Sequence, residues 1–396
     1  MLQIHVSSAI IDAAVTITLA SSALFNVDVS DARISIIFSL LGTMVPFILL
    51  APSASLLAER IKTSRLILAL VVNGLRIIGL ILMGLASSYS ATTRYAIFPL
   101  AFIMLTLSKC YSVAKTSALP QVTTRESFPY FSSRLAMATS VVALIAGGIL
   151  LAINRVFSES TTLFCAAAVV FFLSLISCFE YLRLNNNRSY IELKEDHDVH
   201  SHVMTDNIEI RKIVLEPLKL ISTINKLFIF GGGFRFVVGA ITIAIGLKYR
   251  DEKWILALCF LVATITGFIT NGFAAWLNRQ KWANHIQFYF LGTVALSIFA
   301  MSIVDNLVWS LLVVSLVGSL AALARVFYES RLAMILPASY NAKILSRGEV
   351  YLQLAWVFGA LIAVITYSYA FVGLVSGAML IVSMYCVWNI RTLLQG

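Results

Sequence analysis

Charge-free apolar stretches recur along the chain, and they limit its possible folds more than any other feature. Several of them exceed about 18 residues, enough for a helix rising about 1.5 Å per residue to cross a hydrocarbon core roughly 30 Å thick. Of the 396 residues, 60% are hydrophobic and 12% are charged. A water-soluble domain of this composition would expose large apolar patches. The sequence therefore predicts an all-α protein embedded in a lipid bilayer.

The apolar runs and the polar residues between them predict about twelve membrane-spanning helices. The first six lie near residues 4–25, 34–58, 66–88, 95–118, 135–153 and 161–182. The other six lie near residues 227–247, 254–277, 285–304, 307–329, 350–366 and 371–390. The last two form one apolar run after Glu349, which we divide at residues 366–369 because about 40 residues exceed one crossing. The first run lacks a basic N-terminal region, so we expect a retained helix and not a signal peptide.

The distribution of Lys and Arg predicts the orientation of the chain in the membrane. With the N-terminus inside, 19 of these residues fall in cytoplasmic segments, 6 in outer loops and 4 within spans. Because short cytoplasmic loops carry an excess of positive residues, we expect both termini in the cytoplasm and a location in the plasma (inner) membrane. The net charge of +10 comes without a basic run or a basic-aromatic stripe, so we do not expect nucleic-acid binding.

A long polar segment divides the predicted helices into two halves. It covers residues 185–225, between an N-terminal half over residues 1–184 and a C-terminal half over residues 226–396. Its mixed charge and few aromatic residues are typical of a solvated cytoplasmic linker. Apolar side chains at helical spacing in residues 210–221 fit either an amphipathic helix on the inner leaflet or a lead-in to span seven. The histidines of the linker lack the fixed surroundings of a metal site, so we expect no metal at His197, His200 and His202.

Three short patterns recur in the same order in both halves. The turn after span two matches the turn after span eight, with Glu59, Arg60, Ile61 and Lys62 against Asn278, Arg279, Gln280 and Lys281. The end of span four matches the end of span ten, with Lys109, Lys115 and Pro120 against Arg325, Arg331 and Pro337. Ser133-Arg134 opens span five as Ser346-Arg347 opens span eleven. The nearly equal offsets of 219, 216 or 217, and 213 residues predict a duplicated six-helix unit with parallel halves.

This organisation resembles the major facilitator superfamily, whose members have two six-helix halves, a central cytoplasmic linker and a signature turn between spans two and three. The signature expects an acid-base pair flanked by glycines and further basic residues. The acid-base core is kept here, and Ser55 and Lys62 stand at the glycine positions, in a turn formed by Ser55, Glu59, Arg60, Lys62 and Arg65. The stretch from Lys109 to Pro120 resembles the drug and siderophore exporters of this family. Gly147-Gly148 in span five also match the exporters, although Ala143-Leu144 replace the Gly-Pro pair found there.

Ionisable residues inside spans are costly in lipid and therefore indicate function or a buried partner. Asp12 and Arg235 each lie about nine residues from the inner boundary, at a depth of about 13 Å. The family resemblance implies that spans one, four, seven and ten line the central cavity. Asp12 and Arg235 would then face each other, and Lys109 and Arg325 would join them. These four residues are the candidates for substrate binding and proton coupling.

The same residues also have purely structural interpretations. Asp12 fits a permanently paired acid, and Lys109 and Arg325 fit side chains that reach the nearby inner interface. Glu329 lies four residues after Arg325 on one helix face, which predicts an ion pair. Arg76 in span three is expected to pair locally, because that span is peripheral in the family.

Small and polar residues within the spans add secondary candidates. The three glycines at residues 231–233 admit the close approach of a ligand or of a neighbouring helix. Asn271, Gln353 and Trp356 fit either substrate orientation or packing between helices.

Together these features predict a secondary transporter that moves a small organic solute by alternating access, with proton-coupled efflux as its specific form. Four bases against two acids within the spans favour an anionic or amphipathic solute. We expect a monomer without cofactor, metal or disulfide, and no enzyme, because no catalytic constellation is visible. The alternatives are a transport-inactive sensor or scaffold of the same fold and a lipid-handling membrane protein.

Overall fold

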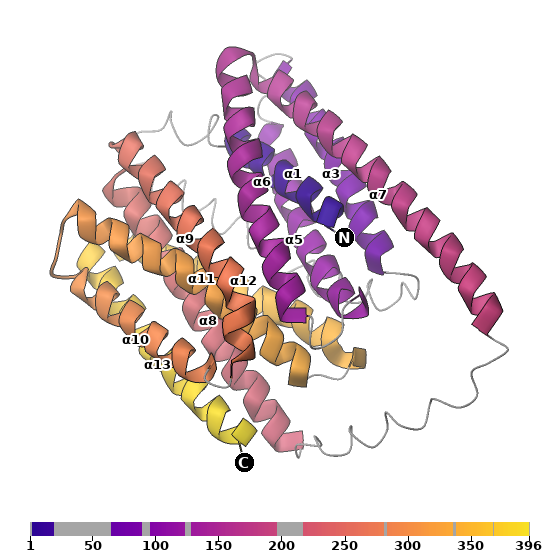
Figure 1. Cartoon of the computed structure of the whole chain (residues 1–396). Coiled ribbons are helices and arrows are strands. Elements are labelled where there is room, and N and C mark those ends of the chain that lie inside the picture. The colour runs from indigo at the N-terminus through magenta and orange to yellow at the C-terminus, as the bar shows by residue number, and fades with distance from the viewer. Residues whose placement is uncertain are drawn as a thin grey trace.

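A computed structural model describes residues 2–19, 65–88, 96–122, 128–195, 217–280, 283–335, 338–366 and 368–395. Within these ranges the chain forms eleven α-helices and no strand (Figure 1). The helices of the first part are α1 (Leu2–Leu19), α3 (Arg65–Ser88), α5 (Ile97–Val122), α6 (Phe128–Val156) and α7 (Glu159–Glu195). Those of the second part are α8 (Pro217–Lys248), α9 (Lys253–Arg279), α10 (Ala283–Ala300), α11 (Leu307–Ile335), α12 (Ala338–Thr366) and α13 (Tyr369–Gln395).

Eleven of the twelve predicted spans coincide with a helix, and the remaining one, at residues 34–58, lies outside the described residues. The end of α12 at Thr366 and the start of α13 at Tyr369 confirm the division of the last apolar run. Helices α7 and α8 extend into the predicted linker, as far as Glu195 and back to Pro217. Residues 217–221 are thus a lead-in to span seven, whereas residues 210–216 and the three linker histidines lie outside the described residues.

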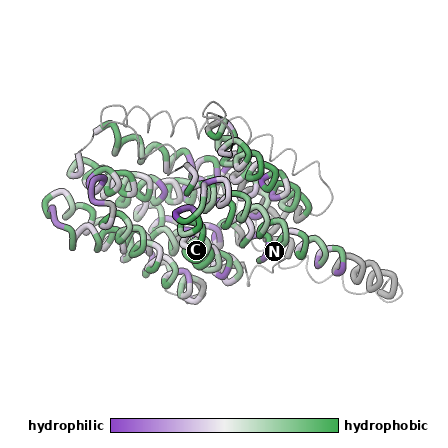
Figure 2. The backbone as a smooth tube through the Cα atoms, turned by 90° about the horizontal axis from the view of Figure 1, so that it is seen from above, coloured by the Kyte–Doolittle hydropathy of each residue, from purple (hydrophilic) through white to green (hydrophobic). Residues whose placement is uncertain are grey.

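The described helices have the length and surface of a multi-pass membrane protein. Eight of them are long and apolar enough to cross a bilayer, and two shorter apolar helices cover Leu2–Thr18 and His285–Ala300. Hydrophobic residues run along most of each helix in Figure 2. Large apolar side chains also point outward, for example Phe179 with 71% and Leu296 with 72% of their surface exposed. In water these surfaces would be unfavourable, whereas in lipid they contact acyl chains.

The helices pack into two groups, each with a core of its own. One core joins residues of α1, α3, α5, α6 and α7, and a larger one joins residues of α8 to α13. We call these sets the N-terminal group and the C-terminal group, and they lie on opposite sides in Figure 1. The contacts within the groups correspond: α1 packs on α6 and α7 as α8 packs on α12 and α13, and α3 packs on α5 and α7 as α10 packs on α11 and α13. This shared pattern supports the duplication inferred from the sequence.

Glycines allow the helices of the C-terminal group to pack closely. A Cβ atom added at Gly239 of α8 would lie 2.0 Å from the Trp356 carbonyl oxygen of α12, and one added at Gly359 would lie 2.0 Å from the Phe236 carbonyl oxygen. Only glycine fits such a crossing, because any side chain would overlap the facing backbone. The glycines at 231–233 likewise contact α11, α12 and α13, so neighbouring helices, and not a ligand, account for them.

Candidate functional site

A cavity of about 440 Å³ lies between the two groups. Its described lining residues come from α6 of the N-terminal group and from α8, α9 and α11 of the C-terminal group. Most of them are apolar, and several are small. The charged ones are Arg235 and Arg325, and no carboxylate occurs among the described lining residues. The polar ones are Thr139, Ser140, Thr242, Thr264 and Asn271.

Hydrogen bonds join the two groups at one end of this cavity. The Ser132 hydroxyl at the start of α6 donates to a Glu329 carboxylate oxygen of α11. The neighbouring Ser133 hydroxyl donates to the backbone oxygen of Asn271 in α9. All four residues are at least partly buried, which shields these bonds from competing solvent. We refer to Ser132, Ser133, Asn271 and Glu329 as the inter-group contact.

Glu329 also holds one of the cavity arginines. The Nε of Arg325 donates to the Glu329 Oε1 over 2.9 Å, which confirms the ion pair predicted from their spacing of four residues. Because its other carboxylate oxygen accepts from Ser132, Glu329 links the Arg325 side chain to the N-terminal group. The sequence indicated the pair within α11 but not the bond across the groups, since a single serine at a helix start carries no signal for a distant partner.

Arg235 lines the same cavity without a comparable partner. It forms no hydrogen bond or ion pair with another residue in the described part of the chain, and its buried Nε is unsatisfied. Its guanidinium carbon lies 5.8 Å from the centroid of the Phe234 ring. Glu349 and Glu329 act on it electrostatically at longer range. Arg235 is therefore a cation in a mostly apolar cavity wall, and its guanidinium forms no hydrogen bond with another described residue.

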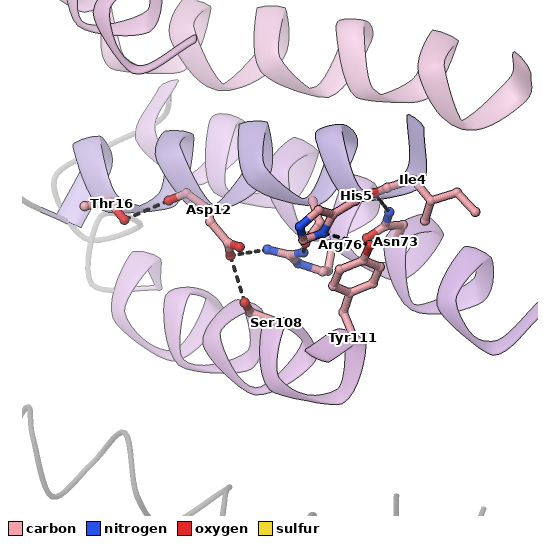
Figure 3. A network of polar contacts seen from close by, with 9 residues as sticks. Ile4, His5, Asp12, Thr16, Asn73, Arg76, Ser108 and Tyr111 are labelled. Carbon is pink, nitrogen blue, oxygen red and sulfur yellow. Dashed lines mark hydrogen bonds and ion pairs between the residues drawn. The ribbon is translucent and has the colours of Figure 1, made fainter. Parts of the chain in front are cut away.

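Asp12 does not form the expected contact with Arg235 among the described residues, and pairs instead with Arg76 of α3 (Figure 3). Its carboxylate accepts from the Arg76 guanidinium and, over 2.8 Å, from the Ser108 hydroxyl. The Arg76 side chain is completely buried, whereas 48% of the Asp12 side chain is exposed. Arg76 also donates to Ser8 over 2.6 Å. These contacts confirm the local pairing predicted for Arg76. The physical reason is that a guanidinium with no access to solvent requires an anion beside it.

A second polar set lies next to this pair on α1. His5 is buried, with Tyr111 of α5 at 3.3 Å from its Nδ1 and Thr139 of α6 at 2.6 Å from its Nε2. His5 therefore joins three helices, α1, α5 and α6, a contact that we did not predict from the sequence. The sequence contained a signal for a polar cluster on α1. His5, Ser8 and Asp12 are three and four residues apart and therefore share one helix face.

The remaining sequence candidates are only partly described. Lys109 lies within α5, Arg65 begins α3, and Asn278 and Arg279 end α9, but their side chains are outside the described part of the structure. Five further candidates of these turns lie entirely outside it: Ser55, Glu59, Arg60, Lys62 and Lys281. Within the described residues no group of three or more His, Cys, Asp or Glu side chains forms a metal site, and all five cysteines are free.

Comparison with known proteins finds distant relatives. No protein-family model matches the sequence. The uncharacterized protein ML2143 of Mycobacterium leprae (strain TN) is 24% identical over an alignment of 394 residues, which covers 94% of this chain and 67% of that protein. Among solved structures, a bacterial homologue of the iron transporter ferroportin, in an outward-facing state with soaked iron, superposes with a TM-score of 0.66 at 13% identity over 98% of both chains.

Two further structures have the same arrangement of helices. The proton:xylose symporter XylE of the major facilitator superfamily, bound to 6-bromo-6-deoxy-D-glucose, gives a TM-score of 0.67 at 13% identity, covering 98% of this chain and 93% of XylE. The human organic anion transporter MFSD10 (TETRAN) gives a TM-score of 0.68 at 12% identity over 98% of both chains. These similarities show that the chain has the fold of the major facilitator superfamily, as its resemblance to that family implied.

Proposed function

We propose that this protein is a secondary transporter that moves a small organic solute across the membrane by alternating access. The observation that carries the proposal is the cavity between two separately packed helix groups, one end of which is closed by hydrogen bonds between the groups. In transporters of this architecture the halves rock against each other around a site near the membrane midplane. Opening the inter-group contact would expose the cavity at that end.

The closed end is the one that carries the C-terminus. Helices α8 to α13 follow one another without a gap of more than two undescribed residues, so α9, α11 and α13 run in the same direction and end on the same side. Asn271 and Glu329 lie toward the ends of α9 and α11. We place this side in the cytoplasm, on the basis of the excess of Lys and Arg in the predicted inner segments. The described conformation would then be outward-facing, as the ferroportin homologue is described to be.

Asp12 remains the candidate for proton coupling. Its carboxylate is half-exposed, and it is held between a buried guanidinium and a hydroxyl of the same helix group. An acid inside a span with access to solvent is a candidate proton carrier. Lys109 on α5, and the two matching turns at residues 55–65 and 278–281, are proposed to contribute to substrate binding and to closure on the cytoplasmic side. Efflux is the proposed direction, from the resemblance to exporters.

Reconstituted protein tests this function. Proteoliposomes loaded with candidate solutes are assayed for counterflow and for uptake driven by an imposed pH gradient. We expect counterflow of at least one solute, driven uptake in the wild type, and loss of the pH-driven component with retained counterflow in Asp12→Asn. The matched control is Asp305→Asn, which removes the same charge from an exposed residue bound to Lys248.

Two results would contradict the proposal. Saturable binding of a solute without counterflow would indicate a sensor or scaffold. Movement of labelled phospholipid between leaflets, with no flux of soluble solutes, would indicate a lipid-handling protein.

A further inference from the structure

The cavity carries a cation, Arg235, that has no ion pair among the described residues, and this cation specifies the ligand more closely than the fold does. We infer that the cavity binds an organic anion with an apolar body, and that Arg235 is the residue that binds the anionic group. The inference rests on the proposed function only where it identifies this ligand as the transported solute, because binding can be measured without transport.

The charges around the cavity differ in how far they are neutralised. Arg325 is paired with Glu329, so its charge is compensated within the protein. Arg235 has no ion pair among the described residues. Lys115, buried on α5, adds positive charge on the N-terminal side and acts electrostatically on Glu329 and Arg325. Among the described residues that act on one another here, three cations therefore stand against the two carboxylates of Glu329 and Glu349.

An anionic ligand would supply the counter-charge and the hydrogen-bond acceptors that Arg235 lacks among the described residues. A buried charge without a hydrogen-bonded counter-ion is costly, and a guanidinium presents its donors in a planar fork that matches a carboxylate. The Asn271 side-chain oxygen is a second buried polar atom of the cavity without a partner among the described residues, and as an acceptor it can bind a donor group of the ligand but not its anionic oxygens. A few polar groups in a mostly apolar cavity are typical of a site that fixes the head of a small molecule.

The remaining lining residues favour an apolar body over a sugar or a metal ion. Three of the cavity hydroxyls, those of Thr139, Ser140 and Thr264, donate to carbonyl oxygens of their own helices. They are therefore not available as donors to a polyol, and apart from the two arginines, Asn271 and Thr242 the rest of the described wall is apolar. A divalent cation would need oxygen ligands, and the described lining offers no carboxylate. A volume of about 440 Å³ suits a molecule of one or two rings.

Binding to purified full-length protein tests this inference. The probes are naphthalene-2-carboxylate and octanoate, each compared with its uncharged amide and with a primary ammonium of the same skeleton, and Fe²⁺ serves as the metal probe. We expect a carboxylate to bind at least about tenfold more tightly than its amide. Arg235→Gln should weaken that binding by about 10- to 100-fold, the range for a charge-assisted bidentate contact, and Arg235→Lys should weaken it less. Arg155→Gln, at an exposed arginine outside the cavity, should bind as the wild type does.

A second substitution keeps Arg235 and supplies its anion internally. Val238 lines the cavity three residues after Arg235 on α8. Val238→Glu places a carboxylate within reach of the guanidinium and should compete with the carboxylate probe, whereas Val238→Gln, of the same size, should leave most of the binding. This pair remains informative if Arg235→Gln does not fold.

Changing the lipid around the protein distinguishes a soluble anion from an anionic membrane lipid as the ligand. In nanodiscs of phosphatidylcholine the soluble carboxylate should bind, and replacement by phosphatidylglycerol should leave its affinity unchanged if the ligand is a soluble solute. Competition by phosphatidylglycerol that disappears in Arg235→Gln would support the same site with a membrane lipid as its ligand.

Three results would overturn the inference: equal affinity for the carboxylate and its amide, equal affinity in wild type and Arg235→Gln, or tighter binding of the ammonium or Fe²⁺ probe. Failure of the proposed function is a separate outcome. Binding that depends on Arg235, with no counterflow of the bound probe, would overturn transport and leave this site standing.

Discussion

The pair of Asp12 and Arg76 allows the structural and coupling roles of Asp12 to be separated. Three proteins are compared with the wild type: Asp12→Asn, Arg76→Met and the double variant. Asparagine keeps the shape of Asp12 and removes its charge. Methionine keeps most of the buried aliphatic volume of Arg76 and removes the charge that requires a partner.

The two single changes should differ in cost because the two side chains differ in burial. Arg76 is completely buried, so Asp12→Asn leaves its guanidinium without a counter-ion among the described residues, with only two neutral acceptors, the Ser8 hydroxyl and the new amide oxygen at position 12. Breaking a fully buried pair costs about 3 to 5 kcal/mol, and the 48% exposure of Asp12 reduces our expectation to about 2 to 3 kcal/mol. Arg76→Met leaves a half-exposed carboxylate that can still accept hydrogen bonds from water and from Ser108. We therefore expect it to lower the free energy of unfolding by about 1 kcal/mol.

The double variant tests the pairing itself. With both charges removed, we expect a total cost of about 1 to 2 kcal/mol, less than that of Asp12→Asn alone, and a coupling free energy of about 2 kcal/mol. Reversible unfolding in a denaturing detergent measures these free energies. The rescued double variant should still lack pH-driven uptake if Asp12 couples transport to protons. Additive costs, or a larger cost for Arg76→Met than for Asp12→Asn, would refute the assignment of Asp12 as the partner of a buried Arg76.

Two other substitutions probe the helix crossing and the cavity charge. Gly239→Ala should destabilise the protein by about 1 to 3 kcal/mol, because its Cβ would lie 2.0 Å from the Trp356 carbonyl oxygen. Gly147→Ala, whose Cβ would meet no described atom within 4 Å, should be neutral or stabilising. Equal thermal stability of the two variants would contradict the close crossing of α8 and α12. Glu329→Gln removes the counter-ion of Arg325 and should tighten binding of naphthalene-2-carboxylate by about tenfold, which a titration of the purified variant measures. Unchanged or weaker binding would show that Arg325 does not contribute to the anion site.

The fold was predictable from the sequence because lipid imposes a simple rule on it. Every backbone polar group in a bilayer must be satisfied within the chain, so long apolar runs become helices whatever their other properties. For that reason the predicted spans within the described residues overlap helices, and the division at Thr366 and Tyr369 agrees with them, whereas α7, α8 and α12 extend beyond the predicted spans. The matching turns indicated a repeat, and the corresponding helix contacts of the two groups support it.

The site was less predictable because depth along a helix does not specify which face a residue occupies. Asp12 and Arg235 were matched by depth, yet Asp12 faces Arg76 within its own group. Only tertiary packing decides that Arg76 is fully buried and therefore takes the nearest anion. The contact of Ser132 with Glu329 and the cavity around Arg235 likewise depend on how α6 meets α9 and α11. The local pair of Arg325 and Glu329 was predictable, since its geometry is set by one helix alone.

Access to the cavity from each side of the membrane tests alternating access most directly. Ala321 lines the cavity on α11, and Ala321→Cys in a protein without its native cysteines is labelled by a membrane-impermeant thiol reagent in oriented vesicles. We predict faster labelling from the side opposite the C-terminus in the parent protein. Ser132→Ala with Ser133→Ala removes both hydrogen bonds of the inter-group contact and should shift access toward the C-terminal side, by about tenfold for each 1.4 kcal/mol lost. Labelling from one side only, unchanged by the two substitutions, would contradict a cavity that opens alternately to the two sides.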